Sequence, residues 1–230
     1  LLINPHLTAD ALFVPHAPQN NSQGMRASNP QKWLQFARHK DILAMVADLI
    51  GDDIILWGTT VFGKPALTGK ATPWHQDGQY WPIQPLASCS AWIAIDEVNT
   101  ENGCMRVIPG SHKGSSVLKH HTNLGNDLTL NQELDKDQFN EKNAVDIILK
   151  PGQMSFHDIN MVHGSRHNTS NKRRAGYVLR FMPATSHFDR KIGAQLGSKS
   201  GVVDFTQRAL YLVRGQDRGG NDLSIGHIKS

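Results

Sequence analysis

The chain has 230 residues, of which 39% are hydrophobic and 19% charged, and its formal net charge at pH 7 is +4. This content suffices for one domain with a sizeable core over residues 1–230. The densest basic cluster, residues 172–174, is too short for a nucleic-acid groove, and no apolar run is long enough to span a bilayer. We therefore expect an anionic or polar small-molecule ligand, with neither nucleic acid nor membrane as a partner.

The chain contains two cysteines, Cys89 and Cys104. Two are too few for a disulfide framework, and a single bridge is the alternative to two free thiols. We expect reduced thiols in a cytoplasmic protein, because disulfides are rare in that compartment.

The first 28 residues are rich in Pro, Asn and Gln, which is typical of a loop. Asn29 and Pro30 then provide an N-cap and a first helical residue. Apolar residues recur at helical spacing as far as Gly51, a favourable C-terminal residue. The sequence therefore predicts two helices within residues 29–51.

Short β-branched and aromatic runs follow these helices and predict strands. The predicted strands cover residues 54–62, 88–98, 104–108, 145–149, 154–156, 162–164 and 175–182. Asn102-Gly103 predicts a tight hairpin between the second and third strands, because this pair tolerates positive φ angles. The polar stretch 114–143 is interpreted as an insertion near the mouth of the site. Short strands with early helices indicate a mainly β, double-sheet roll with flanking N-terminal helices.

His75 and Asp77 are two residues apart, so a strand would direct both side chains to one face. Trp74, Tyr80 and Trp81 surround this pair, and aromatic rings are typical of a pocket that shields a metal and receives a substrate. Two imidazoles and one carboxylate form the facial triad that suits non-haem iron(II). The sequence therefore predicts an iron site that needs one more histidine.

His163 is the preferred third ligand, because the apolar segment 159–162 carries it into Gly164 and Ser165. His157 and His167 are the rival candidates in the same region. His120 and His121 lie in the polar insertion, where we expect them to be solvated.

Arg174 opens the strand after His163, and we expect it to lie across a hairpin from that residue. A planar guanidinium holds a carboxylate with two parallel hydrogen bonds, which a lysine cannot do. Ser165 is placed to donate a hydroxyl to the same carboxylate. Arg173 has the wrong strand parity and Arg180 lies six residues deeper, so Arg174 is the predicted anchor for a dicarboxylate.

An ordered series of motifs resembles the phytanoyl-CoA dioxygenase family over roughly residues 54–183. The matching stretches are residues 74–77, 80–82, 91–92, 101–104, 108–113, 150–152 and 163–165, followed by Asn168 and Arg174. So many matches in one order make chance resemblance implausible.

This resemblance implies a double-stranded β-helix (a jelly roll), iron(II), 2-oxoglutarate and O2. It assigns His75, Asp77 and His163 to the metal. It assigns Arg174 and Ser165 to the far carboxylate of 2-oxoglutarate, and the resemblance also places Trp92 and Lys64 near this co-substrate. The implied reaction hydroxylates an organic substrate while 2-oxoglutarate is decarboxylated to succinate and CO2.

The substrate is expected to be a small or medium organic molecule, handled beside Tyr80 and Trp81 by a monomer or homodimer. The family name is not taken to indicate phytanoyl-CoA. Two other functions stay open: a catalytically inactive binding or regulatory protein with this fold, and a zinc-dependent hydrolase, since zinc accepts the same ligands. The hydrolase interpretation leaves Arg174 without a role.

Overall fold

The structure is a computed structural model that describes residues 10–13, 15–17, 29–114, 116–200 and 205–227. The chain divides into two compact units. Unit 1 comprises residues 1–11, 61–79 and 92–177, and unit 2 comprises residues 12–60, 80–91 and 178–230. The chain thus passes repeatedly from one unit to the other, and the single domain over residues 1–230 stays a prediction.

Both predicted helices are confirmed, and both lie in unit 2. Helix α1 spans Pro30–Ala37, and the side chain of Asn29 accepts a hydrogen bond from the backbone N–H of Lys32. Helix α2 spans Lys40–Ile50 and ends at Gly51, whose φ of +90° lies in the region that favours glycine. A third helix, α3 (Arg190–Ser200), was not predicted.

The larger sheet has six strands in the order β1-β2-β12-β5-β10, with β14 paired to β2. Its strands are β1 (Asp10–Phe13), β2 (Ile54–Lys64), β5 (Cys89–Ala94), β10 (Met154–Asp158), β12 (Arg174–Pro183) and β14 (Tyr211–Arg214). Strand β1 corrects the expectation of loop for residues 10–13, whereas most of the first 28 residues lie outside the described residues. The predicted mainly β chain with N-terminal helices is confirmed.

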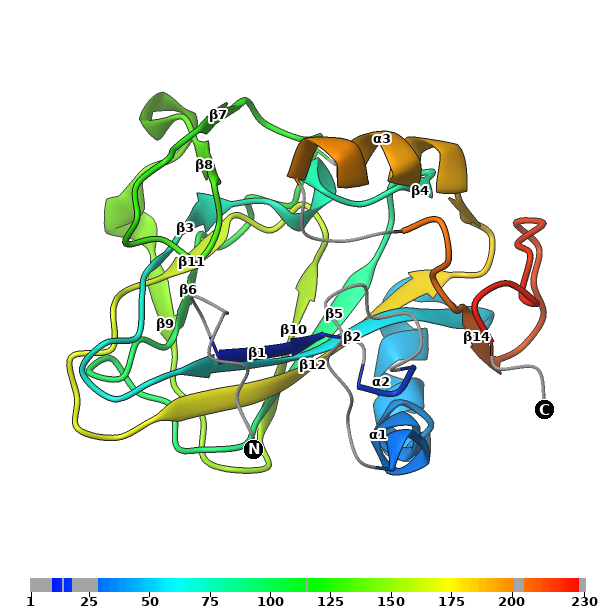
Figure 1. Ribbon diagram of the computed structural model, residues 1–230, viewed down its shortest axis with the longest axis horizontal. Coiled ribbons are helices and arrows are strands. Elements are labelled where there is room, and N and C mark those ends of the chain that lie inside the picture. Colours follow the sequence, from blue (N-terminus) through cyan, green and yellow to red (C-terminus); the bar gives the residue numbers. More distant parts are fainter. Residues whose placement is uncertain (1–9, 14, 18–28, 115, 201–204, 228–230) are drawn as a thin grey trace. The chain divides into compact units, whose positions relative to one another are not determined.

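A four-stranded sheet lies in unit 1, with the order β3-β11-β6-β9 (Figure 1). Its strands are β3 (Thr72–His75), β11 (His163–Ser165), β6 (Met105–Val107) and β9 (Val145–Ile147). Unit 1 also contains β7 (His120–Thr122), β8 (Gln132–Leu134) and the 3-10 turns η2 (Asp77–Gln79), η3 (Lys136–Gln138) and η4 (Glu141–Asn143). In unit 2, β4 (Ile83–Gln84) pairs with β13 (His187–Phe188).

Two predicted hairpins are wrong, because the strands on either side of each turn belong to different sheets. Strand β5 belongs to the larger sheet and β6 to the smaller one, so the turn at Asn102-Gly103 connects two sheets. Gly103 does have the positive φ, +78°, that such a turn needs. Likewise β11 and β12 are not paired, and Arg174 is not a hairpin neighbour of His163. A tight turn is a local signal that leaves the choice of pairing partner open.

The predicted insertion 114–143 forms part of the core of unit 1. Its two strands, β7 and β8, pair with each other, and Leu134 is completely buried. Leu134 packs with Ile108 and Val162, and the partly buried Trp74 and Phe139 cover this cluster. Because the segment is mostly polar in composition, its attachment to the smaller sheet through these few apolar contacts was not predicted.

Gln76 fastens the insertion to the segment that carries the predicted metal ligands. Its fully buried amide donates to the carbonyls of Asn160 (2.7 Å) and Ser116 (3.2 Å) and accepts from the N–H of Leu118 (2.7 Å). The backbone N–H of Gln76 donates to Nε2 of His120 over 3.1 Å. His120 is therefore held by the protein, and the expectation that it is solvated is wrong.

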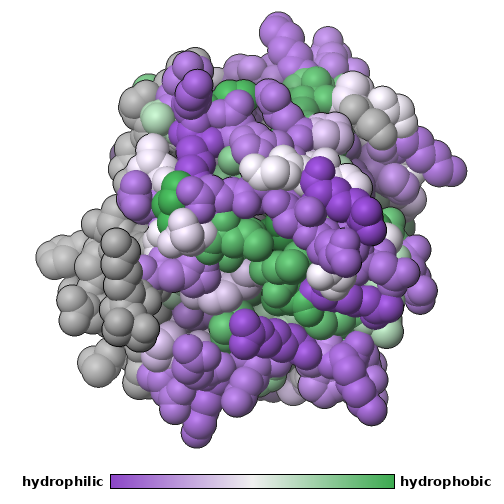
Figure 2. All heavy atoms as spheres, turned by 90° about the vertical axis from the view of Figure 1, so that its right-hand side faces the viewer, coloured by the Kyte–Doolittle hydropathy of each residue, from purple (hydrophilic) through white to green (hydrophobic). Residues whose placement is uncertain are grey.

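The face shown in Figure 2 is mostly hydrophilic, with hydrophobic residues gathered in a band across its middle. Helices α1 and α2 bury one side, through Leu34 and Val46, and leave Phe36 and Leu49 exposed.

No helix among the described residues is long and apolar enough to cross a membrane. Cys89 and Cys104 are buried and form no disulfide with each other, which agrees with the predicted reduced thiols.

Replacing Gln76 with Met should destabilise the protein, because the new side chain retains the volume but makes none of the three amide hydrogen bonds. Each buried backbone group left unpaired costs about 1–3 kcal/mol, so we expect a loss of roughly 3 kcal/mol or more in the free energy of unfolding. Urea titration measures this loss. Gln35→Met is the matched control, since Gln35 is exposed on α1. Equal stabilities of the two variants would contradict the role of Gln76.

Candidate metal centre

His75 and His163 are directly opposed in neighbouring antiparallel strands. Strand β3 ends at His75 and β11 begins at His163, and the two Cα atoms are register partners. Opposed residues of an antiparallel pair point to the same face. The two ring centroids consequently lie 4.2 Å apart, and the residues are only 4% and 8% exposed.

Each of these imidazoles is oriented by a backbone carbonyl two residues earlier. Nδ1 of His75 lies 2.8 Å from the carbonyl of Pro73, and Nδ1 of His163 lies 2.9 Å from that of Met161. A carbonyl only accepts, so both Nδ1 atoms carry the proton and both Nε2 atoms keep a lone pair. Burial lowers the pKa of His163 to about 3, which keeps this ring neutral as a metal ligand must be.

Asp77 completes a group of three possible ligands. It is the first residue of η2, just beyond β3, so the turn and not strand alternation directs its side chain. Its Oδ1 lies 3.6 Å from Nε2 of His75. One ligand atom from each of His75, Asp77 and His163 lies within 4.8 Å of the others, and the described residues contain no other such group. Two imidazoles and a carboxylate fit an iron(II) facial triad.

Arg174 is a buried cation at the start of β12. It is 5% exposed, and its Nε donates to the carbonyl of Gly103 over 3.1 Å. Its guanidinium carbon lies 5.3 Å from the ring centre of Trp92. Burial lowers the pKa of Arg174 to about 10, so the side chain stays charged at neutral pH. Within the described residues Arg174 forms no ion pair with a carboxylate.

Lys64 is a buried amine beside the same turn. Its Nζ donates to the carbonyls of Lys70 and Arg166, the latter over 2.7 Å. Burial lowers the pKa of the Lys64 amine to about 6, and the charge of Arg174 is the second cause of this shift. The buried guanidinium of Arg174, which has no carboxylate partner among the described residues, creates a local environment that favours an anion.

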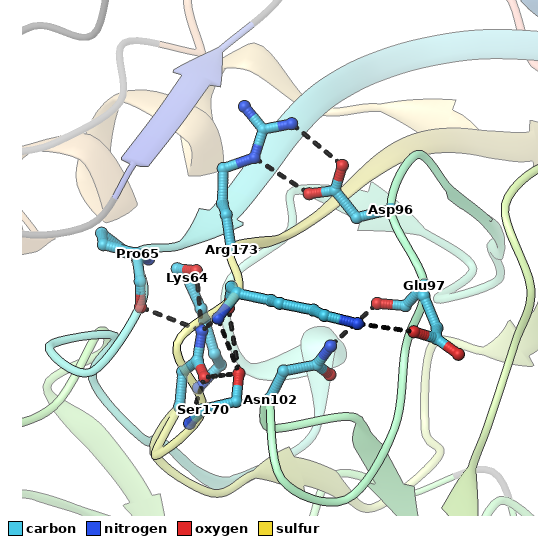
Figure 3. A network of polar contacts seen from close by, with 9 residues as sticks. Lys64, Pro65, Asp96, Glu97, Asn102, Ser170 and Arg173 are labelled. Carbon is cyan, nitrogen blue, oxygen red and sulfur yellow. Dashed lines mark hydrogen bonds and ion pairs between the residues drawn. The ribbon is translucent and has the colours of Figure 1, made fainter.

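The neighbouring Arg173 is neutralised at the surface. Its Nε and Nη2 donate to the two carboxylate oxygens of Asp96, each over 2.9 Å, and point away from the Lys64 network (Figure 3). The amide of Asn168 meanwhile donates to the carbonyls of Lys64, Pro65 and Lys172, which fastens this loop to the end of β2. Arg173, which lies just before β12, is thus exposed, whereas Arg174 is buried.

Trp92 depends on a residue that the sequence analysis did not select. A Cβ atom at Gly176 would lie 2.1 Å from the indole of Trp92, far below van der Waals contact. Any side chain at Gly176 would therefore displace Trp92 from its place beside Arg174. A glycine inside a buried strand is the signal that could have identified this position.

The other predicted site residues occupy different surroundings. Ser165 lines a cavity of about 500 Å³ together with Thr72, Trp74 and Arg106. Tyr80 and Trp81 belong to unit 2, where Trp81 packs edge-on against Trp57 with ring centroids 4.5 Å apart. The roles of Ser165 in binding the co-substrate and of Tyr80 and Trp81 in binding the substrate stay predictions.

The rival histidines also have defined places. His167 lies 2.7 Å from the exposed carboxylate of Asp127, and His121 lies 2.7 Å from that of Asp135. Both rings are about half exposed, so His121 is solvated as predicted. His157, in contrast, is buried beside Asp77, with its Nε2 3.7 Å from Oδ2 of that residue.

Known proteins similar to this chain are oxygenases. Peroxisomal phytanoyl-CoA dioxygenase of Bos taurus is 28% identical over 193 residues, which are 76% of this chain and 57% of that protein. The human protein of the same name is 33% identical over 64% of this chain and 45% of its own length. The chain thus spans about half the length of these curated relatives.

Solved structures of oxygenases are similar to this chain in fold. The non-heme monooxygenase ThoJ has a TM-score of 0.65 and 28% identity, over 81% of this chain and 63% of that chain. EvdO2 of Micromonospora carbonacea var. aurantiaca, complexed with 2-oxoglutarate, has a TM-score of 0.57 and 28% identity, over 78% of this chain and 68% of that chain. These likenesses confirm the predicted jelly-roll class of fold.

A profile of the family described as phytanoyl-CoA dioxygenase (PhyH) matches residues 8–176. This range contains the three possible metal ligands and Arg174. Because the match covers well over half of the chain, the protein belongs to the phytanoyl-CoA dioxygenase family.

Proposed function

We propose that this chain provides the active site of an iron(II)- and 2-oxoglutarate-dependent dioxygenase that hydroxylates a small or medium organic substrate. The observation that carries this proposal is the buried group of His75, Asp77 and His163, in which both imidazoles present Nε2 lone pairs beside a carboxylate. The family match and the likeness to EvdO2, solved with 2-oxoglutarate, support the same chemistry.

The three side chains would hold iron(II) on one face and leave its remaining positions for other ligands. When bound, the iron would couple O2 activation and the decarboxylation of 2-oxoglutarate to substrate oxidation. The protein's own contribution is to keep the imidazole of His163 neutral, to orient both imidazoles through the carbonyls of Pro73 and Met161, and to exclude bulk water from a site whose ligands are at most 9% exposed.

Arg174 would bind the far carboxylate of 2-oxoglutarate. A buried guanidinium whose hydrogen-bond partner among the described residues is a carbonyl has donors left for a carboxylate, and the low-dielectric surroundings strengthen such a pair. The amine of Lys64 lies beside the same turn, and Trp92 limits the space beside Arg174. Ser165 is proposed to donate its hydroxyl to the same co-substrate.

The substrate is proposed to be a polar or anionic organic molecule that contacts Tyr80 and Trp81. A monomer or homodimer in the cytoplasm is the proposed form, and the two buried cysteines, which are not joined in a disulfide, support that location. Phytanoyl-CoA is not inferred, because the family name describes relatives that share about a third of their residues or fewer with this chain.

Metal binding should require all three proposed ligands. Replacing His75, Asp77 or His163 with Ala should weaken Fe(II) binding by more than about a hundredfold, since even outer residues of metal sites contribute tenfold to a hundredfold. Anaerobic equilibrium dialysis with Fe(II) measures this affinity. His121→Ala is the control, because that imidazole is half exposed and pairs with Asp135. Full Fe(II) affinity in a His163→Ala variant would move the third ligand elsewhere.

Arg174→Ala should raise the KM for 2-oxoglutarate by about a hundredfold, the loss expected for a buried charge-assisted pair worth a few kcal/mol. Fe(II) affinity should change little. Arg174→Lys should recover only part of the loss, because an ammonium cannot form the fork. Arg173→Ala is the neighbouring control, since that residue pairs with Asp96 at the surface. A KM that is unchanged in both Arg174 variants would contradict the assignment.

Succinate release from 2-oxoglutarate, measured with Fe(II) and a panel of organic acids and alcohols, tests the proposed reaction. Formation of succinate that stops in the Asp77→Ala variant supports the dioxygenase. Tight Fe(II) and 2-oxoglutarate binding without succinate would indicate the inactive binding protein. Hydrolysis of a substrate with Zn(II) and no need for 2-oxoglutarate would indicate the hydrolase.

A further inference from the structure

His157 is a third buried imidazole next to the proposed metal ligands, and it has no role in the function proposed above. It lies on β10 and is 7% exposed. Its ring centroid lies 4.8 Å from that of His163, and its Nε2 lies 3.7 Å from Oδ2 of Asp77. A buried imidazole at this position either binds the metal or acts on a residue that does.

Hydrogen bonding separates His157 from the other two imidazoles. In His75 and His163, a backbone carbonyl accepts a hydrogen bond from Nδ1–H, which leaves Nε2 of the neutral ring with a lone pair. Nδ1 of His157 is buried and has no hydrogen-bond partner among the described residues. No acceptor favours a proton on this Nδ1, whereas a carboxylate lies next to Nε2. The neutral ring is therefore most stable with its proton on Nε2, which removes the lone pair that a metal would need.

The two oxygens of the Asp77 carboxylate lie near different imidazoles. Oδ1 is the oxygen nearer His75, at 3.6 Å from its Nε2, and Oδ2 is the oxygen nearer His157, at 3.7 Å. A carboxylate that binds a metal through one oxygen commonly has its second oxygen hydrogen-bonded by the protein, and this bond orients the ligand.

We propose that His157 is a positioning residue, whose Nε2–H donates to Oδ2 of Asp77 and so directs Oδ1 toward the metal. This inference rests on the proposed metal site. The separation of 3.7 Å is longer than a hydrogen bond, so the two groups must approach by about 0.5 Å. Such contacts in active sites often tighten when the remaining ligands bind.

Two substitutions distinguish hydrogen bonding from packing. Leu at position 157 fills the space without a donor, whereas the side-chain amide of Gln places an N–H close to where Nε2 of histidine lies. We therefore expect His157→Leu to weaken metal binding by about tenfold to a hundredfold, and His157→Gln to recover much of that loss. His16→Leu is the matched control, because His16 is a 4% exposed imidazole of unit 2 that bonds Thr59.

Titration of the purified protein with Co(II), followed by the visible absorption of the bound ion, measures these affinities. Urea titration of the same samples reports any loss of fold. Weaker binding by His157→Leu, recovery by His157→Gln and unchanged binding by His16→Leu would support the proposal. Equal affinity of the Leu variant and the unaltered protein would overturn it and leave the metal site standing.

Loss of binding in both His157 variants, to the level of His163→Ala, would also overturn the positioning role, because it would make His157 a ligand. Absence of Co(II) and Fe(II) binding by the unaltered protein would overturn the proposed function together with this inference. The two failures are therefore distinguishable by the behaviour of the unaltered protein.

Discussion

The register of β11 against β3 is the constraint on which the candidate metal centre depends. It opposes His163 to His75 and puts both imidazoles on one face. A slip of one residue would turn Gly164 to that face and move His163 to the other side. Gly164 also suits the register, because a Cβ atom there would lie 3.1 Å from the carbonyl of Thr72, tighter than ordinary contact. Local packing thus protects the alignment that the metal would need.

Two further layers of contact fix the direction of each ligand. Backbone carbonyls two residues earlier orient the imidazoles, and Gln76 connects the Asp77 turn to the carbonyl of Asn160 and to the 116–120 segment. The N–H of Gly78 adds a bond to the carbonyl of Ile159 over 3.0 Å. The segments that carry the ligands are therefore joined by backbone and amide hydrogen bonds before any metal binds. Such preorganisation lowers the conformational cost of binding an ion.

Much of this arrangement was predictable from the sequence, because its signals are local. The cap at Asn29, the stop at Gly51 and the apolar strands each depend on a few neighbouring residues, and they were confirmed. Motif order also brought His75, Asp77 and His163 together as candidates, although the prediction put Asp77 on a strand and the structure puts it on a 3-10 turn.

Pairing between distant segments was not predictable in the same way. The turn at Gly103 was recognised, but its strands join different sheets, since the partner of a strand is set by contacts far along the chain. His120 was expected in solvent, because nothing near it in the sequence reveals the N–H of Gln76 as its partner. His157 resembled His163 in sequence, and only the acceptors around each ring distinguish them.

The central claim is that His75, Asp77 and His163 bind one metal ion together. A crystal structure of the protein with Co(II), using anomalous diffraction at the cobalt edge, tests this claim most directly. The account predicts a single ion bound by Nε2 of His75, Oδ1 of Asp77 and Nε2 of His163, with His157 beside Oδ2 and not bound to the metal. An ion ligated by His157, or located away from these three residues, would contradict it.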